Sequence, residues 1–521
     1  MQKLYKDIPN LSSLSLDVRT AKLYTLCAVV DRLPEAQPFG TASLVDEIGH
    51  RATQPPVTET GHEGIAYAVL PRKAGALLNP ISPDQACIDF LAHTHTDVKG
   101  RHNDRIRVPL ANTVFQTGEP STMFSSRWNL DTYKGKLSMT RRKSLHSHTI
   151  NLSAVPQDKP TPAPLAPISQ EVTRLSIPLL PLTVPRQVDG HMGNIIRSIV
   201  GPDGVKITAA TELEQIVPQY FKSRNEPAQA TSAWALIIPK QVAHLATKVT
   251  MSLVDTNAER PDSAASLLQG FQSLWQQDPP RWNNTVQEAL ARGARLHKVL
   301  SGGGGWGKKA GLLSLDPTPL GPPQKIEKAN GEQNEGSVED DYNSVEDFST
   351  ALKPVVRDGD YIQFFISAAP TQQSDGGATL EHLHNLEEAA GNGAWTWEFG
   401  VVPSTVDKIP GGSWQHTGDP STKIVAFRGA FGALAEGGLT LMRGLNVHYD
   451  TGFAQKDLNT TMIDVPFSRW SAVRLMPKHR VTTTVGDLLD RVKYEGPEKS
   501  YRIRQPYQHH SWESDNAGNP P

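Results

Sequence analysis

The chain contains few cysteines. Only Cys27 and Cys87 occur among its 521 residues, which excludes the multiple disulfides of small secreted scaffolds and a zinc site built from cysteine alone. Two thiols in so long a chain are typical of a reducing compartment. Because this length exceeds an ordinary single core, we also expect more than one domain.

Long apolar runs and an excess of one charge sign are also absent. No stretch of about eighteen uncharged apolar residues occurs, so we expect no transmembrane helix. The 52 lysines and arginines nearly balance the 54 aspartates and glutamates, and the formal net charge is -2. This balance excludes a global attraction to nucleic acid or membrane, so any such contact requires a local patch.

The first residues lack the uninterrupted apolar segment of a secretory signal peptide. Asp7 and Asp17 fit poorly with a mitochondrial presequence, because such presequences contain few acidic residues. We therefore expect a cytoplasmic or nuclear protein, and a mitochondrial location stays open.

Familiar catalytic signatures are missing, among them G-x-S-x-G, H-E-x-x-H, C-x-x-C and the Rossmann fingerprint. His93, His95 and Asp97 form an H-x-H-x-D pattern that resembles the metal-binding signature of the metallo-β-lactamase superfamily. Val98 stands where that signature continues with histidine, and a metal needs at least three convergent ligands. We therefore nominate no catalytic residue, metal or cofactor, and we favour a protein that is not an enzyme.

Two segments of biased composition divide the chain. The sequence PQDKPTPAPLAP (156–167) contains five prolines and predicts an extended spacer, whereas residues 316–347 are acidic and poor in apolar side chains, which predicts disorder. The predicted partition is an N-terminal α+β region (1–155), a Pro-rich linker (156–170), a mixed α/β region (171–315), an acidic linker (316–350), a β-rich domain (351–505) and a polar tail (506–521).

The N-terminal region combines both types of element. The mostly apolar segment 21–30 predicts a buried helix, and segments 105–115 and 121–128 predict strands around a Gly-Glu-Pro turn. A basic patch follows, which consists of Lys134, Lys136, Arg141, Arg142 and Lys143. We favour a solvated, disordered patch over one that contacts phosphates.

The middle region is also mixed. Thr211-x-x-Glu214 and Thr285-x-x-Glu288 are capping boxes, and the second predicts a helix that reaches Leu300. Residues 232–239 predict a buried strand between the two helices.

The C-terminal region is rich in predicted strands. Residues 361–368 form an apolar run, and apolar residues alternate with polar or small ones over 395–401. The fold class is therefore α+β, with a mixed middle region and a strand-rich C-terminal domain that resembles a sandwich or a barrel.

The most informative segment is the glycine run LSGGGGWGKKAG (300–311). Gly302, Gly307 and Lys308 fit the phosphate-binding pattern G-x-x-x-x-G-K-[ST], but Lys309 replaces the magnesium-binding hydroxyl. Such a loop also leaves a strand and enters a helix, whereas a helix is predicted before this run and prolines follow it. These differences disfavour a nucleotide-hydrolysing loop.

Two interpretations of the run remain. The glycines could allow close packing around a buried Trp306, or the run could form an exposed loop with anion-binding backbone N–H groups, two cations and a stacking tryptophan. On the second interpretation the binding residues are Gly302, Gly303, Gly304, Gly305, Trp306, Gly307, Lys308 and Lys309.

Several segments resemble one family. The segment VLSGGGGWGKKAGLLSLDP (299–317), the opening MQKLYKDIP (1–9), LANTVF (110–115) and FGALAEGG (431–438) are similar to segments of uncharacterised proteins of filamentous fungi. The resemblance implies a lineage, but it brings no activity and no functional residue.

Together these features predict a non-enzymatic binding or assembly protein that contacts RNA or a ribonucleoprotein through loop 302–309. One alternative is an enzyme or sensor that holds a small phosphorylated ligand in the same loop. A second alternative is a scaffold whose linkers space protein-binding domains. The oligomeric state cannot be predicted from the sequence.

Overall fold

Strands dominate the computed structural model, and they form four sheets in the part of the chain that it describes. The described residues are 20–35, 60–70, 85–96, 100–131, 136–152, 170–201, 203–254, 264–278, 280, 283–302, 311–317, 355–367, 395–404, 430–444 and 458–475. All of them belong to one unit, Met1–Met476. The predicted α+β class is confirmed.

Six strands close into an antiparallel barrel, because one strand, β9, pairs with both β10 and β15. In ring order they are β9 (Arg186–Met192), β10 (Ile195–Val200), β14 (Leu313–Leu315), β13 (Arg295–Gly302), β12 (Ala233–Ile238) and β15 (Tyr361–Ser367). Two short strands, β8 (Leu179–Pro181) and β11 (Lys206–Thr208), extend this sheet. Strands β12 and β15 are buried on both faces, which explains their nearly continuous apolar sequence.

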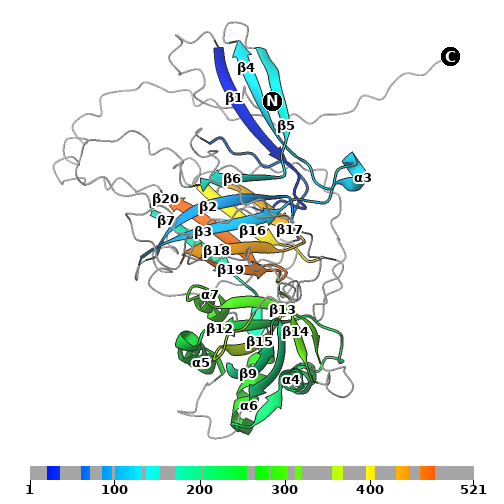
Figure 1. The fold of residues 1–521 in the computed structure, drawn as a ribbon, viewed down its shortest axis with the longest axis vertical. Helices are drawn as coiled ribbons and strands as arrows, with labels where there is room; N and C mark the ends of the chain where they lie inside the picture. The colour runs from blue at the N-terminus through cyan, green and yellow to red at the C-terminus, as the bar shows by residue number, and fades with distance from the viewer. Residues whose placement is uncertain are drawn as a thin grey trace, which may run out of the picture. The chain divides into compact units, whose positions relative to one another are not determined.

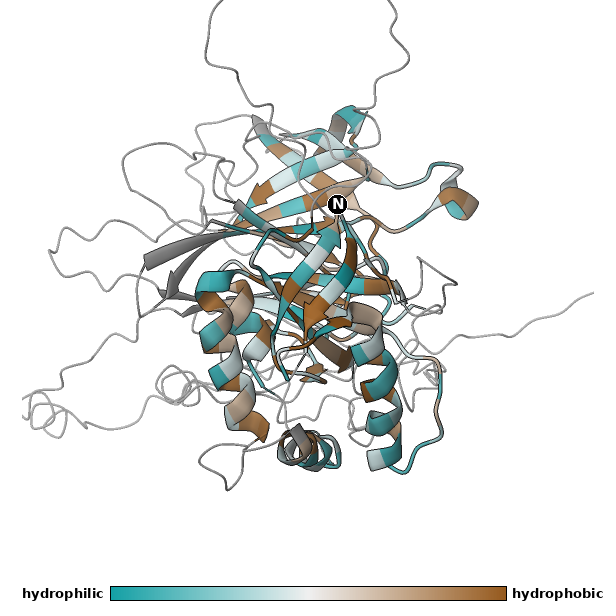
Figure 2. Ribbon diagram, turned by 60° about the horizontal axis from the view of Figure 1, so that its bottom comes forward, coloured by the Kyte–Doolittle hydropathy of each residue, from teal (hydrophilic) through white to brown (hydrophobic). Residues whose placement is uncertain are grey.

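Four helices accompany the barrel strands in the sequence (Figure 1): α4 (Ala209–Ser223), α5 (Lys240–Val254), α6 (Ala264–Trp275) and α7 (Thr285–Leu290). Pro218 lies inside α4, so this proline does not end the helix. Around the helices and along the partly exposed strands, polar and apolar residues alternate (Figure 2), which is how such an element buries one face. No described helix has the length and apolar content that crossing a bilayer requires.

A histidine lies inside the barrel. His297 on β13 is paired with Ala235, whose neighbours in the apolar cluster include Ile237 and Phe364. The His297 Nδ1 lies 2.8 Å from the carbonyl oxygen of Asp316, to which Nδ1–H donates. Burial lowers the pKa of His297 to about 4, so the imidazole is neutral at physiological pH.

Two further sheets pack face to face as a sandwich. One contains β19 (Leu458–Ile463), β18 (Leu439–Gly444), β3 (Gly100–Pro109), β2 (Cys87–Thr96) and β6 (Ser147–Asn151). The other contains β17 (Ala430–Ala435), β16 (Trp395–Val401), β20 (Arg469–Leu475) and β7 (Gln170–Ser176). Phe90 and Phe399 stack between them, with ring centroids 4.1 Å apart. Strands from both ends of the chain therefore build this core.

Buried ion pairs fix the strands of the sandwich. Arg443 on β18 donates to both carboxylate oxygens of Asp104 on β3, at 2.7 and 2.8 Å, and the Trp470 indole N–H donates to the same carboxylate. On the opposite face of the sheet, Arg105 and Arg107 both donate to Asp89. Paired and hydrogen-bonded in this way, these charges tolerate burial.

The barrel and the sandwich meet at β13 and β19. The Thr461 hydroxyl accepts a hydrogen bond from Leu296 N–H (2.8 Å) and lies 3.3 Å from the Leu296 carbonyl oxygen. The Asn459 amide donates to the carbonyl oxygen of Ala294. Side chains of β19 therefore satisfy backbone groups of Leu296 on β13 and of Ala294, which precedes this strand.

Two predicted helices are wrong. Segment 21–30 contains strand β1 (Thr20–Ala28), because it pairs along its whole length with a neighbouring strand. The second predicted helix is only the short α7, which ends at Leu290, and its N-cap is Asn284 rather than Thr285. Gly293 then adopts a φ of 95°, a left-handed conformation that ends the helix, and β13 begins at Arg295. The glycine run consequently follows a strand.

Candidate nucleic-acid interface

Four residues of the basic patch, Lys136, Arg141, Arg142 and Lys143, belong to a strand of a small sheet rather than to a disordered segment, and Lys134 lies outside the described residues. The strands of this sheet, in spatial order, are β1, β4 (Met123–Asp131) and β5 (Lys136–Ser144), and all neighbours are antiparallel (Figure 1). The three strands contain six lysines and arginines but only one carboxylate, Asp131. The sheet is thus a concentrated positive charge in a chain that is nearly neutral.

One face of this sheet, which we call the basic face, collects most of the cations. Side chains alternate between the two faces of a strand, and the register places Tyr24, Arg127 and Arg141 side by side across β1, β4 and β5. Lys22 and Lys143 lie on the same face in neighbouring rows. The Arg127 guanidinium lies 5.7 Å from the centroid of the Tyr24 ring.

Among the described residues, no carboxylate pairs with the main cations of the basic face. Arg127, Arg141 and Lys143 form no ion pair within this part of the chain. The Arg127 Nε is buried and has no hydrogen-bond partner among the residues that the structure describes, although such groups are usually satisfied. The face therefore presents donors that no described carboxylate neutralises, beside a half-exposed tyrosine, and this combination suits phosphate and base contacts.

The opposite face, which we call the aromatic face, carries Phe124, Trp128, Met139 and Arg142. The Arg142 guanidinium lies 3.9 Å from the centroid of the Phe124 ring. The two faces thus differ in chemistry, because one is cationic and the other is mostly apolar with planar groups.

The predicted binding loop is described only at its start. Gly302 is the exposed last residue of β13, and Gly303, Gly304, Gly305, Trp306, Gly307, Lys308 and Lys309 lie outside the described residues. The loop joins β13 to its antiparallel neighbour β14. It does leave a strand, contrary to the prediction, but another strand follows it rather than the helix that a P-loop requires.

Both flanks of the loop contact the first turn of α4. A Cβ on Gly302 would lie 3.6 Å from the Cβ of Ala210, and the Gly311 carbonyl oxygen accepts a hydrogen bond from the Ala210 N–H (3.3 Å). Gly311 has a φ of 77°, and a Cβ there would lie 2.5 Å from the Thr208 hydroxyl oxygen. Glycine is required at Gly311 both by its backbone conformation and by this close approach.

The other predicted sites are not assembled in the described part of the chain. His93 and His95 belong to β2, whereas Asp97 lies outside the described residues. Among the described residues, no three histidine, cysteine or acidic side chains converge as metal ligands.

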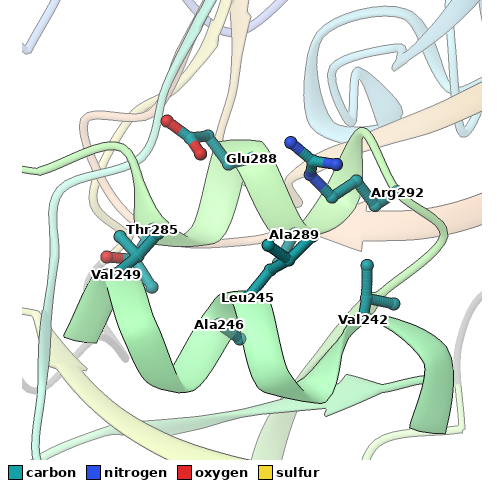
Figure 3. A pocket seen from close by; sticks show the side chains of 8 residues that line it. All are labelled: Val242, Leu245, Ala246, Val249, Thr285, Glu288, Ala289 and Arg292. Atoms are coloured by element: carbon teal, nitrogen blue, oxygen red, sulfur yellow. The ribbon is translucent and has the colours of Figure 1, made fainter. Parts of the chain in front are cut away.

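A cavity between α5 and α7 is too small for a ligand. Its volume is about 10 Å³, close to the minimum for one water molecule. Its lining residues are Val242, Leu245, Ala246, Val249, Thr285, Glu288, Ala289 and Arg292 (Figure 3).

Part of this candidate interface is visible in the sequence. The sequence pattern selects Lys134, Lys136, Arg141, Arg142 and Lys143 as a basic patch, but it does not connect them with Tyr24 or Arg127. The alternating pattern of β4 could have indicated which residues share a face, whereas the pairing with β1 carries no local signal.

No known protein family, curated protein or solved structure matches this chain. The resemblance to the fungal family therefore stays a prediction.

Proposed function

We propose that this protein binds RNA without catalysing a reaction, and that the basic face of the β1–β4–β5 sheet contacts the phosphates. The observation that carries the proposal is the cross-strand pair Arg127–Arg141, which places two arginines directly opposite each other. Like charges in this position destabilise a sheet by up to about 1 kcal/mol. A phosphate between the two guanidinium groups would turn this repulsion into two charge-assisted hydrogen bonds.

The neighbourhood of the pair supports the same reading. Tyr24 is 52% exposed beside Arg127, and a surface aromatic ring is the type of side chain on which bases stack. Lys143 and Lys22 continue the positive charge on either side of the pair. A polyanion with planar bases complements this arrangement better than a compact anion, because the cations form a row rather than a pocket.

The loop 302–309 is a second contact in this proposal. Lys308 and Lys309 would add phosphate contacts, and Trp306 would add a stacking group. The rival hypothesis, a small phosphorylated ligand held by the same loop, predicts that such a ligand raises the melting temperature while RNA does not.

RNA binding is tested by fluorescence anisotropy with a labelled 20-nucleotide random RNA at several salt concentrations. The triple variant Arg127→Gln, Arg141→Gln and Lys143→Gln should lower the salt slope by about 2, because each single-strand phosphate contact contributes about 0.7. Raising the salt four-fold should then weaken wild-type binding about 18 times more than binding by the variant.

The control changes charge elsewhere in the protein. Arg197→Gln with Lys222→Gln removes two exposed cations on β10 and α4, and binding should stay at the wild-type level. If the triple variant binds the RNA pool as tightly as the wild type at every salt concentration, the basic face is not the interface. The double variant Lys308→Ala and Lys309→Ala measures the loop separately.

A further inference from the structure

The aromatic face of the β1–β4–β5 sheet presents planar groups that phosphate binding does not explain. Phe124 and Trp128 lie four residues apart on β4, so both point to this face. At about 3.3 Å per residue their positions are about 13 Å apart. Two separate stacking positions therefore lie along a single strand.

Hydrogen bonds hold the Trp128 indole in one orientation. Its Nε1–H donates to the Ser126 hydroxyl at 2.9 Å and lies 3.3 Å from the Thr25 hydroxyl on β1. Ser126 is buried, and its hydroxyl also contacts that of Thr25. An indole fixed in this way loses little entropy when a base stacks on it.

Arg142 and Phe124 form the second stacking position. Its guanidinium stacks on the Phe124 ring, and the side chain is exposed to solvent. A guanidinium plane offers a second face, on which a base stacks with both π and charge contributions. Met139, which is 52% exposed opposite Trp128, adds an adaptable apolar contact on the same face.

The edge strand β5 links the two faces. It pairs only with β4 among the described strands, and three consecutive cations follow one another along it. Arg141 and Lys143 point to the basic face, and Arg142 points to the aromatic face. A phosphate backbone that follows this edge can turn its bases onto the aromatic face.

From this arrangement we infer that the ligand is single-stranded, with two unstacked bases lying on Trp128 and on the Arg142–Phe124 pair. This inference rests on the proposed function, and it specifies the form of nucleic acid. In a duplex, neighbouring bases cover each other at a spacing of 3.4 Å, so their faces are not accessible. Stacking platforms are used where bases are unpaired.

The experiment compares four labelled probes in fluorescence anisotropy: a 12-nucleotide RNA, the DNA of the same sequence, and the blunt 12-base-pair duplex of each. The wild type should bind either single strand at least 10-fold more tightly than the duplexes. Trp128→Leu should weaken single-strand binding by about 5- to 150-fold, which corresponds to the loss of one stacked base. Its salt slope should stay unchanged, because no phosphate contact is lost.

Matched variants separate stacking from folding and from charge. Trp128→Phe keeps a ring and should retain most of the affinity. Arg142→Lys keeps the charge but removes the planar group, so it should weaken single-strand binding at an unchanged salt slope. Tyr67→Leu removes an aromatic side chain that is 54% exposed outside this sheet, and it should bind like the wild type. Circular dichroism identifies any variant that fails to fold. If Trp128→Leu does not fold, the affinity of Arg142→Lys tests the stacking inference.

The outcomes distinguish the two proposals. If the wild type binds none of the probes at low salt, the proposed function itself fails. If duplex and single strand bind equally, and Trp128→Leu and Arg142→Lys bind like the wild type, then the protein binds nucleic acid but the stacking inference is wrong. A preference for RNA over DNA with both stacking effects present would show that the ribose is also recognised.

Discussion

Acidification should destabilise the barrel through His297. Above its ordinary pKa of 6.5 this histidine is neutral in both the native and the unfolded chain. Between pH 6.5 and the native pKa of about 4, only the unfolded chain binds the proton. Stability therefore falls as the pH falls through this window, and the loss is complete below about pH 4.

The size of the effect follows from the two pKa values. Each unit of difference corresponds to about 1.4 kcal/mol, and between pH 7 and pH 5 the unfolded chain gains most of a proton. Protonation of His297 in the unfolded chain should therefore lower the free energy of unfolding by about 2 kcal/mol over this interval. For a domain of the barrel's size, that is a decrease of about 4–8 °C in melting temperature.

Urea titrations at pH 7 and pH 5, followed by tryptophan fluorescence, measure this difference. The control is His297→Asn, because its amide can still donate to the Asp316 carbonyl but does not titrate. Arg295 and Asp316, the charged residues that act on His297, are present in both proteins, so their contributions cancel. The reasoning is refuted if the variant loses as much stability between the two pH values as the wild type does.

Three further predictions concern buried groups. Arg443→Met should lower the free energy of unfolding in urea by about 3–5 kcal/mol, because it leaves the Asp104 carboxylate buried and unpaired. The double variant Arg443→Met with Asp104→Asn should lose less stability. Gly311→Ala should lower stability by about 1–3 kcal/mol, given its positive φ, and a normal melting temperature would contradict this. A thiol reagent at pH 8 should modify exposed Cys27 but not Cys87, whose pKa burial raises to about 12, until urea exposes both thiols.

Much of the β structure could be predicted from local sequence. Strands β12, β15 and β16 are short runs of apolar or alternating residues, and such runs specify a strand wherever they are buried. Segment 21–30 is ambiguous by the same criterion, since its apolar residues fit a helix as well as a strand. The pairing of β1 with β4 decides the outcome, and that contact is about one hundred residues distant in the sequence.

The candidate site could be predicted only as a list of cations. Lys and Arg residues are visible in any sequence, but their number does not show that Arg127 faces Arg141. That fact depends on the register of β4 against β5, including a bulge after Arg127. The end of α7 could not be predicted for a comparable reason. A single glycine is compatible with a helical pattern, and only its φ shows that the helix ends there.

The sheet that joins β3 to β18 has a consequence for biosynthesis. A ribosome that adds about 5–20 residues per second needs roughly 16–66 s for the roughly 330 residues between Pro109 and Leu439. Throughout that time one edge of β3 has no partner, although Ile106 and Val108 already expose apolar surface beside it. We therefore expect premature termination before β18 to yield an aggregating product rather than a smaller folded protein.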